Sequence, residues 1–193
     1  MSGFNSFSIN TIFPWREYTM RSFGFTLIDL LTTLSITTLL LTVGLPNFSA
    51  QIQNSRVKTA MLSVQEALQL TRVSAVSTNR RATISSLVQW EEGWEIFYDL
   101  NNNGTREPSE NVIKQHEGLK GVRVKTSEPV RNYVSYVGTG EGTKANGNTG
   151  GAFQAGTFTI CPEAKGAGYE LILARGGRVR KTEITAAKCE EAR

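Results

Sequence analysis

The sequence predicts an α+β protein in which a long amino-terminal helix packs against a carboxy-terminal antiparallel β domain. Three observations support this fold class: an apolar run at residues 25–45, apolar residues at helical spacing over 46–78, and alternating apolar and polar residues over 79–193. The 193 residues, of which 39% are hydrophobic and 20% charged, suffice for one modest globular domain together with this helix.

The run at residues 25–45 contains a single charged residue, Asp29. Roughly 20 apolar residues in a helix span a bilayer, so we expect one membrane-spanning helix here. Its threonine and serine hydroxyls can donate to carbonyl oxygens one turn earlier, which lowers their cost in lipid. A secretory signal peptide is the alternative, although no small-x-small cleavage motif follows the run.

The residues around the start of this run carry a specific pattern, Arg21-Ser22-Phe23-Gly24 followed by Phe25-Thr26-Leu27-Ile28-Asp29. This pattern resembles the type IV prepilin signature. The resemblance implies that a prepilin peptidase cuts after Gly24 and methylates the new amino-terminal Phe25, so that residues 1–24 are a leader. Such leaders are often short and basic, and we expect translation to start at Met20 and not at Met1.

Asp29 stands where prepilins usually carry glutamate, which is longer by one methylene. A lone carboxylate within a spanning helix costs about 2.5–3.5 kcal/mol and therefore usually has a partner. We expect Asp29 to pair with the amine of Phe25 in an adjacent subunit of a filament. The alternative is that Asp29 caps the start of its own helix, where the helix dipole favours negative charge.

Beyond the apolar run the helix is predicted to become amphipathic. Apolar residues at spacings of three and four describe one face: Val57, Ala60, Met61, Val64, Ala67, Leu68, Ala75 and Val76. The opposite face carries Arg56, Lys58, Gln65, Gln69 and Arg72. We expect the apolar face to pack on the sheet that follows.

Alternating apolar and polar residues predict an antiparallel sheet or small sandwich. The expected strands are 81–89, 94–98, 111–116, 121–125, 132–137, 153–160, 169–173 and 178–184. The glycine-rich stretch 138–151 is expected to be a mobile surface loop.

Two parts of the β domain carry a second resemblance. Trp90, Gly93-Trp94, Phe97 and Asp99-Leu100-Asn101-Asn102-Asn103-Gly104, and later Gly177-Arg178-Val179-Arg180, resemble the FimT/GspH group of minor pilins and pseudopilins. This resemblance implies the type IV pilin fold and assembly with other pilins or minor pilins. It also implies a single-pass inner-membrane protein with a periplasmic carboxy-terminal domain, which later becomes part of a pilus at the cell surface. Arg16 and Arg21 on the leader side fit that orientation.

The segment Asp99–Glu110 has the spacing of an EF-hand loop, with oxygens at its first, third and fifth positions, Gly104 at the sixth and a carboxylate at the twelfth. However, its flanks are predicted strands, and Asn101 and Asn103 are neutral. A β-hairpin connection rich in Asn and Gly explains the same residues without calcium. Two cysteines and one histidine are too few for a Cys/His zinc site. We expect no cofactor.

Cys161 and Cys189 bracket the last predicted hairpin. In the periplasm they can form a disulfide, which would contribute about 3 kcal/mol and hold the base of the hairpin. Two free buried thiols are the alternative.

The tip of that hairpin carries cations and no acid: Arg175, Arg178, Arg180 and Lys181, around Gly176-Gly177. Guanidinium groups pair well with phosphate oxygens, and glycines allow a close approach of the backbone. The turn resembles the Gly-Arg-x-Arg element of FimT-type pilins, which bind DNA during natural transformation. By that resemblance Arg178 and Arg180 form the core of a DNA-binding site, with Arg175 and Lys181 beside them. Tyr169 is the only aromatic residue nearby, so we expect sequence-independent contact with the phosphates of double-stranded DNA. A solvated turn, or one that binds acidic neighbours in a filament, is the alternative.

The sequence favours a binding or structural protein over an enzyme. His116 has no nucleophile partner in a recognisable motif, so we expect no enzymatic activity. The net charge of +4 is too small to indicate nucleic-acid binding without the local cluster. The function we expect is that of a DNA-binding minor type IV pilin. A structural minor pilin that primes pilus assembly and a pseudopilin of a type II secretion system are the alternatives.

Overall fold

A computed structural model describes residues 24–192, except for the side chains of residues 43–47. The chain divides into two units, residues 1–43 and 44–193, and each is described by itself. Apart from Gly24, the expected leader, with Met20 and Arg21, lies outside the described residues.

The first unit contains the start of helix α1 (Leu27–Thr78). Thr26 and Asp29 form a reciprocal cap. Asp29 Oδ2 accepts hydrogen bonds from the Thr26 amide at 3.0 Å and the Thr26 hydroxyl at 2.8 Å, and the Asp29 amide donates to Thr26 Oγ1 at 3.3 Å. The expected back-bonding of the hydroxyls is confirmed. The hydroxyls of Thr32, Thr33, Ser35, Thr37, Thr38 and Thr42 each donate to a carbonyl three or four residues earlier.

Among the residues whose side chains are described, no helix contains a stretch that is both long enough and apolar enough to cross a membrane. The expected span at 25–45 extends into residues 43–47, which fall outside that set, so it stays a prediction.

In the second unit, α1 buries the apolar face expected from its spacing. Val57, Ala60, Met61, Val64, Ala67, Leu68 and Ala75 are all at most 5% exposed. Val76 is the exception at 49% exposed, so its inclusion in the buried face was wrong. It follows Ala75 directly and is therefore rotated about 100° around the helix from that buried residue.

All eight expected strands are present, in two four-stranded antiparallel sheets with the orders β3-β2-β1-β5 and β4-β6-β7-β8. The ends differ by a few residues: Gln89 lies beyond β1, and Phe153 precedes β6. The elements are β1 (Ala82–Ser86), η1 (Trp90–Glu92), β2 (Gly93–Tyr98), β3 (Val112–Glu117), β4 (Val122–Thr126), η2 (Glu128–Val130), β5 (Tyr133–Tyr136), β6 (Gly156–Pro162), β7 (Gly168–Leu173), β8 (Val179–Ile184) and α2 (Ala186–Glu191).

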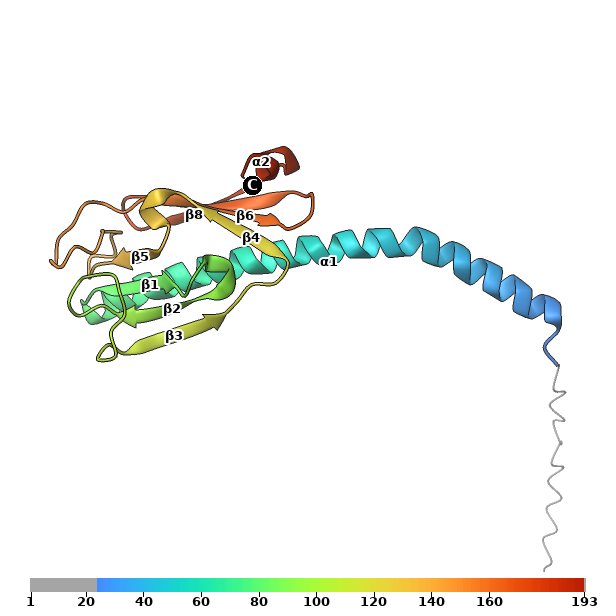
Figure 1. Ribbon diagram of the computed structural model, residues 1–193, viewed down its shortest axis with the longest axis horizontal. Helices are drawn as coiled ribbons and strands as arrows, with labels where there is room; N and C mark the ends of the chain where they lie inside the picture. The colour runs from blue at the N-terminus through green and yellow to red at the C-terminus, as the bar shows by residue number, and fades with distance from the viewer. Residues whose placement is uncertain (1–23, 193) are drawn as a thin grey trace, which may run out of the picture. The chain divides into compact units, whose positions relative to one another are not determined.

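Both sheets share one core with the second half of α1, which runs along them in Figure 1. The first sheet contributes Ile84 and Ile96, and the second contributes Phe158 and Leu171, all fully buried. Trp90 packs edge-on against Phe158, with ring centroids 4.9 Å apart. The expected packing of the amphipathic helix on the β domain is therefore confirmed.

Arg81, only 5% exposed, ties the two long loops beside the first sheet together. Its guanidinium donates to Asn102 Oδ1 at 2.8 Å and to the carbonyl oxygens of Thr143 and Thr149 at 3.1 and 3.2 Å. Burial lowers the pKa of Arg81, and the nearby Asp99 carboxylate opposes this shift. The stretch 138–151 was expected to be mobile, but the structure fastens it to the domain because a buried arginine needs these carbonyl oxygens as partners.

Candidate nucleic-acid interface

The cationic turn joins β7 to β8. The Ala174 amide donates to the Arg178 carbonyl at 2.9 Å, and the Gly177 amide donates to Ala174 at 2.9 Å, which closes a tight turn. Gly177 has a φ of +76°, a conformation that favours glycine. Arg175 and Arg178 are exposed at this turn.

The strand register divides the four cations between two faces. Arg180 pairs with Ile172, and Arg178, which directly precedes β8, lies two residues earlier and therefore on the same face. Lys181 pairs with the buried Leu171, so it lies on the opposite face of the sheet, although its own side chain is exposed. The structure thus brings Arg178 and Arg180 together and separates Lys181 from them.

The turn contacts both α1 and the loop after β5. Arg72 of α1 donates from Nε to the Gly140 carbonyl at 2.8 Å and from an Nη to the Gly176 carbonyl at 3.3 Å. A Cβ on Gly177 would lie 2.0 Å from the Gly140 oxygen, so only glycine fits this contact. The cations therefore project from a turn that is fastened at its backbone.

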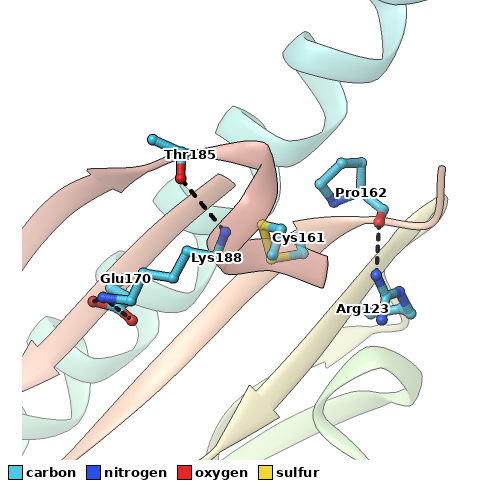
Figure 2. Close-up of a disulfide and its surroundings, with 7 residues drawn as sticks. Arg123, Cys161, Pro162, Glu170, Thr185 and Lys188 are labelled. Atoms are coloured by element: carbon cyan, nitrogen blue, oxygen red, sulfur yellow. Dashed lines mark hydrogen bonds and ion pairs between the residues drawn. A yellow bond between two sulfur atoms is a disulfide. The ribbon is translucent and has the colours of Figure 1, made fainter. Parts of the chain in front are cut away.

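The disulfide between Cys161 and Cys189 is present, with Cα atoms 5.7 Å apart. It links β6 to α2, a short helix that Thr185 caps by accepting a hydrogen bond from the Lys188 amide. Figure 2 shows Lys188 reaching from α2 to Glu170 on β7, with Nζ 2.9 Å from the carboxylate. The disulfide joins the segments at the end of the hairpin away from its tip, as expected from the sequence.

Among the described residues, the four cations of the turn form no ion pair. Within residues 24–192, no carboxylate lies within 4.0 Å of the charged groups of Arg175, Arg178, Arg180 or Lys181. Tyr169, the only aromatic residue expected near them, packs against the core. The turn can therefore offer charge and hydrogen-bond donors to an anion but no ring for stacking on a base.

The Asp99–Glu110 loop uses its carboxylates internally. Asp99, 2% exposed, accepts hydrogen bonds from the amides of Asn103 and Gly104 at 3.0 and 2.9 Å. Glu110 accepts from the Leu100 amide at 2.7 Å. Among the described residues no group of three or more His, Cys, Asp or Glu side chains could hold a metal ion. The carboxylate oxygens of Asp99 and Glu110 thus accept hydrogen bonds from backbone amides of the loop itself, as in a turn that needs no metal ion.

Sequence reasoning missed Arg72 and Arg81 as structural residues of this region. Arg72 was assigned only to the polar face of the helix, and Arg81 to a strand. Their partners are backbone carbonyls of distant loops, which leave no pattern in the sequence. The short helix α2 was also missed, because six residues are too few to show a helical period.

At the amino-terminal end, Phe25 is 97% exposed, and Asp29 takes part in the cap with Thr26. Both expected assembly residues therefore lie at the start of α1.

Comparison with solved structures identifies the class of fold. The type IV minor pilin FimU of Pseudomonas aeruginosa is similar at 21% identity, with a TM-score of 0.51, over 67% of this chain and 90% of FimU. A second crystal form of FimU gives 22% identity, a TM-score of 0.49, and coverage of 65% of this chain and 91% of FimU. EpsH, a minor pseudopilin of the type 2 secretion system of Vibrio cholerae, gives 14% identity, a TM-score of 0.47, and coverage of 66% of this chain and 96% of EpsH. No curated protein matches this chain in sequence.

The long helix packed on antiparallel sheets thus gives this protein the fold of a type IV pilin, as seen in FimU. Residues 60–177, more than half of the chain, match the family described as Type II transport protein GspH, and the protein belongs to that family.

Proposed function

We propose that this protein is a minor type IV pilin that binds double-stranded DNA through its β7–β8 turn during natural transformation. One observation carries the proposal: Arg175, Arg178 and Arg180 are exposed, free of ion pairs within the described residues, and held on a turn that Arg72 and Gly140 fasten. Pre-organised guanidinium groups can bind phosphates without first losing a protein partner.

The proposed mechanism is electrostatic and independent of base sequence. Each phosphate contact releases counterions, so the binding constant falls with salt by a logarithmic slope of about −0.9 per contact. With no ring in the turn and no element fitted to a groove, recognition of individual bases is not expected.

The test is a binding titration of full-length protein in detergent against a short duplex. Arg178→Gln with Arg180→Gln should abolish the mobility shift at moderate salt, and at low salt, where binding is still measurable, should lower the salt slope by about 2. Arg56→Gln with Arg131→Gln removes the same charge from α1 and from the segment after η2, and should bind like the unaltered chain. Equal binding by the two double variants would refute the assignment.

Membrane anchoring and assembly complete the proposal. We infer that prepilin peptidase cuts between Gly24 and Phe25, that residues 25–45 hold the protein in the inner membrane, and that Asp29 then pairs with a neighbouring Phe25 amine in the filament. The exposed Phe25 and the free Asp29 Oδ1, which accepts no hydrogen bond within the described residues, support this. Mass spectrometry of the native chain should show a methylated amino terminus at Phe25.

A second candidate is a pseudopilin of a type II secretion system, which the description of the matching family favours. Deletion of the gene would then abolish secretion of folded substrates and leave transformation frequency unchanged. Loss of transformation with normal secretion would support the DNA-binding pilin. Loss of piliation together with transformation would support a structural minor pilin that primes assembly.

A further inference from the structure

The sheet β4-β6-β7-β8 has one face toward the core and one outer face. Its register aligns two outward rows: Lys125, Thr159, Glu170 and Thr182 form the first, and Thr157, Ile172 and Arg180 form the second. The inward neighbours Val124, Phe158 and Leu171 are buried. Because side chains alternate along a strand, these outward rows share the face that carries Arg178.

Cations lie at both edges of this outer face. Arg180 is on the edge strand β8, Arg178 directly precedes that strand, and Lys125 is on the other edge strand, β4. Lys125 is exposed and, within the described residues, has no ion pair. The threonines between them, Thr157, Thr159 and Thr182, have hydroxyl groups of the kind that donate to phosphate oxygens.

The acidic residue on this face is already neutralised. Glu170 lies in the inner strand β7, and Lys188 of α2 reaches its carboxylate (Figure 2), with Nζ 2.9 Å from the nearest oxygen. Two further acids, Glu190 and Glu191, belong to α2. The disulfide joins α2 to Cys161, which lies in the outward row next to that of Lys125 and Glu170, on the side away from Arg180. These acids therefore lie toward the disulfide end, away from the β7–β8 turn.

The spacing of the two cationic edges fits a duplex. Three interstrand steps of about 4.8 Å separate the backbones of β4 and β8 by about 14 Å. The major groove of B-DNA is about 12 Å wide, so cations at that separation can reach phosphates on both sides of a groove. Cations confined to the turn could contact the phosphates of only one DNA strand.

We propose that duplex DNA lies across this outer face, with Lys125 as a second phosphate anchor opposite Arg178 and Arg180. This inference rests on the proposed function, since it extends the same site to a second edge of the sheet. The preferred ligand is then double-stranded DNA, because a duplex can bind the cations at both edges of the sheet, whereas a single strand can bind those at one edge only.

The test compares Lys125→Gln with Lys58→Gln, an exposed lysine of α1 that serves as the matched charge control. Full-length protein in detergent is titrated with a duplex and with a single strand of the same length, over a range of salt. Lys125→Gln should lower the duplex salt slope by about 0.9 and leave single-strand binding unchanged. Thermal unfolding should be the same for both variants, because both side chains are exposed.

The outcomes separate the two proposals. If Lys125→Gln matches Lys58→Gln on the duplex while the Arg178 and Arg180 variant loses binding, the second anchor is wrong and the turn remains the site. Equal loss on both ligands would also overturn the two-edge geometry. If the unaltered chain binds neither ligand, the proposed function fails and this inference with it.

Discussion

The Nε of Arg72 lies 2.8 Å from the carbonyl oxygen of Gly140, and this bond joins α1 to the loop beneath the cationic turn. The same guanidinium reaches Gly176 in the turn itself. Arg72 is thus a positioning residue for Arg178 and Arg180.

We expect Arg72→Met to loosen the turn and leave the fold intact. Two charge-assisted hydrogen bonds are lost, which should lower the free energy of unfolding by about 1–3 kcal/mol. Hydrogen exchange should accelerate at residues 174–178, and duplex affinity should fall less than in the Arg178 and Arg180 double variant. Arg56→Met is the control. Unchanged exchange in the turn would contradict the positioning role.

Because Cys161 and Cys189 form a disulfide, we expect the free energy of unfolding to depend on the redox conditions. Replacing Cys161 and Cys189 with serine should lower the free energy of unfolding by about 2–4 kcal/mol, because the unfolded chain gains freedom across a separation of 28 residues. Denaturant unfolding of the unaltered chain with and without a reductant should give the same difference. A reductant should have no effect on the serine variant, since these are the protein's only cysteines.

Asp29 allows its two roles to be tested apart. Asp29→Asn keeps an oxygen that can accept from the Thr26 amide but removes the charge, whereas Asp29→Ala removes both. If pairing with a neighbouring amine drives assembly, both variants should be lost from filaments. Normal incorporation of Asp29→Asn alone would show that the cap is the function of Asp29. Immunoblots of sheared filaments give the readout.

Because Tyr136 is buried, we expect the free energy of unfolding to decrease at alkaline pH. Burial raises the pKa of Tyr136 above its ordinary value of 10.0, so above pH 10 the unfolded chain releases this proton while the folded chain keeps it. Stability should therefore be complete below pH 10 and fall by up to about 1.4 kcal/mol per pH unit above it.

Tyr136→Phe should remove that part of the pH dependence. Its hydroxyl has no hydrogen-bond partner among the described residues, so the substitution should also be neutral or stabilising at pH 7. The measurement is the free energy of unfolding from pH 7 to 11. The same alkaline slope in both proteins would contradict this assignment.

The sequence predicted the order of elements well because both periods are local. Alternation identified all eight strands, and the three-four spacing identified the buried face of α1 apart from Val76. Residues 178–181 stood out because their charges adjoin a Gly-Gly turn. Periodicity cannot show which strands pair, so the structure was needed to define the two sheets and to place Lys125 and Arg180 on opposite edge strands of one sheet.

The residues that fasten the loops were not predictable for a different reason. Arg81 and Arg72 bind main-chain oxygens that are brought near only when the sheets form, and any residue type can supply such an oxygen. An arginine that fastens a loop therefore looks like one that faces water. The same limit explains why 138–151 was expected to be mobile.

Arg81 donates hydrogen bonds to the carbonyl oxygens of Asn148 and Thr149, and these bonds determine where the protein can be labelled for microscopy. A glycine-rich loop would ordinarily be chosen for an epitope tag, but an insertion there would strip a buried guanidinium of its acceptors and unfasten the neighbouring loop. The connection at residues 163–167, where Ala164 and Lys165 are exposed, is a better insertion point.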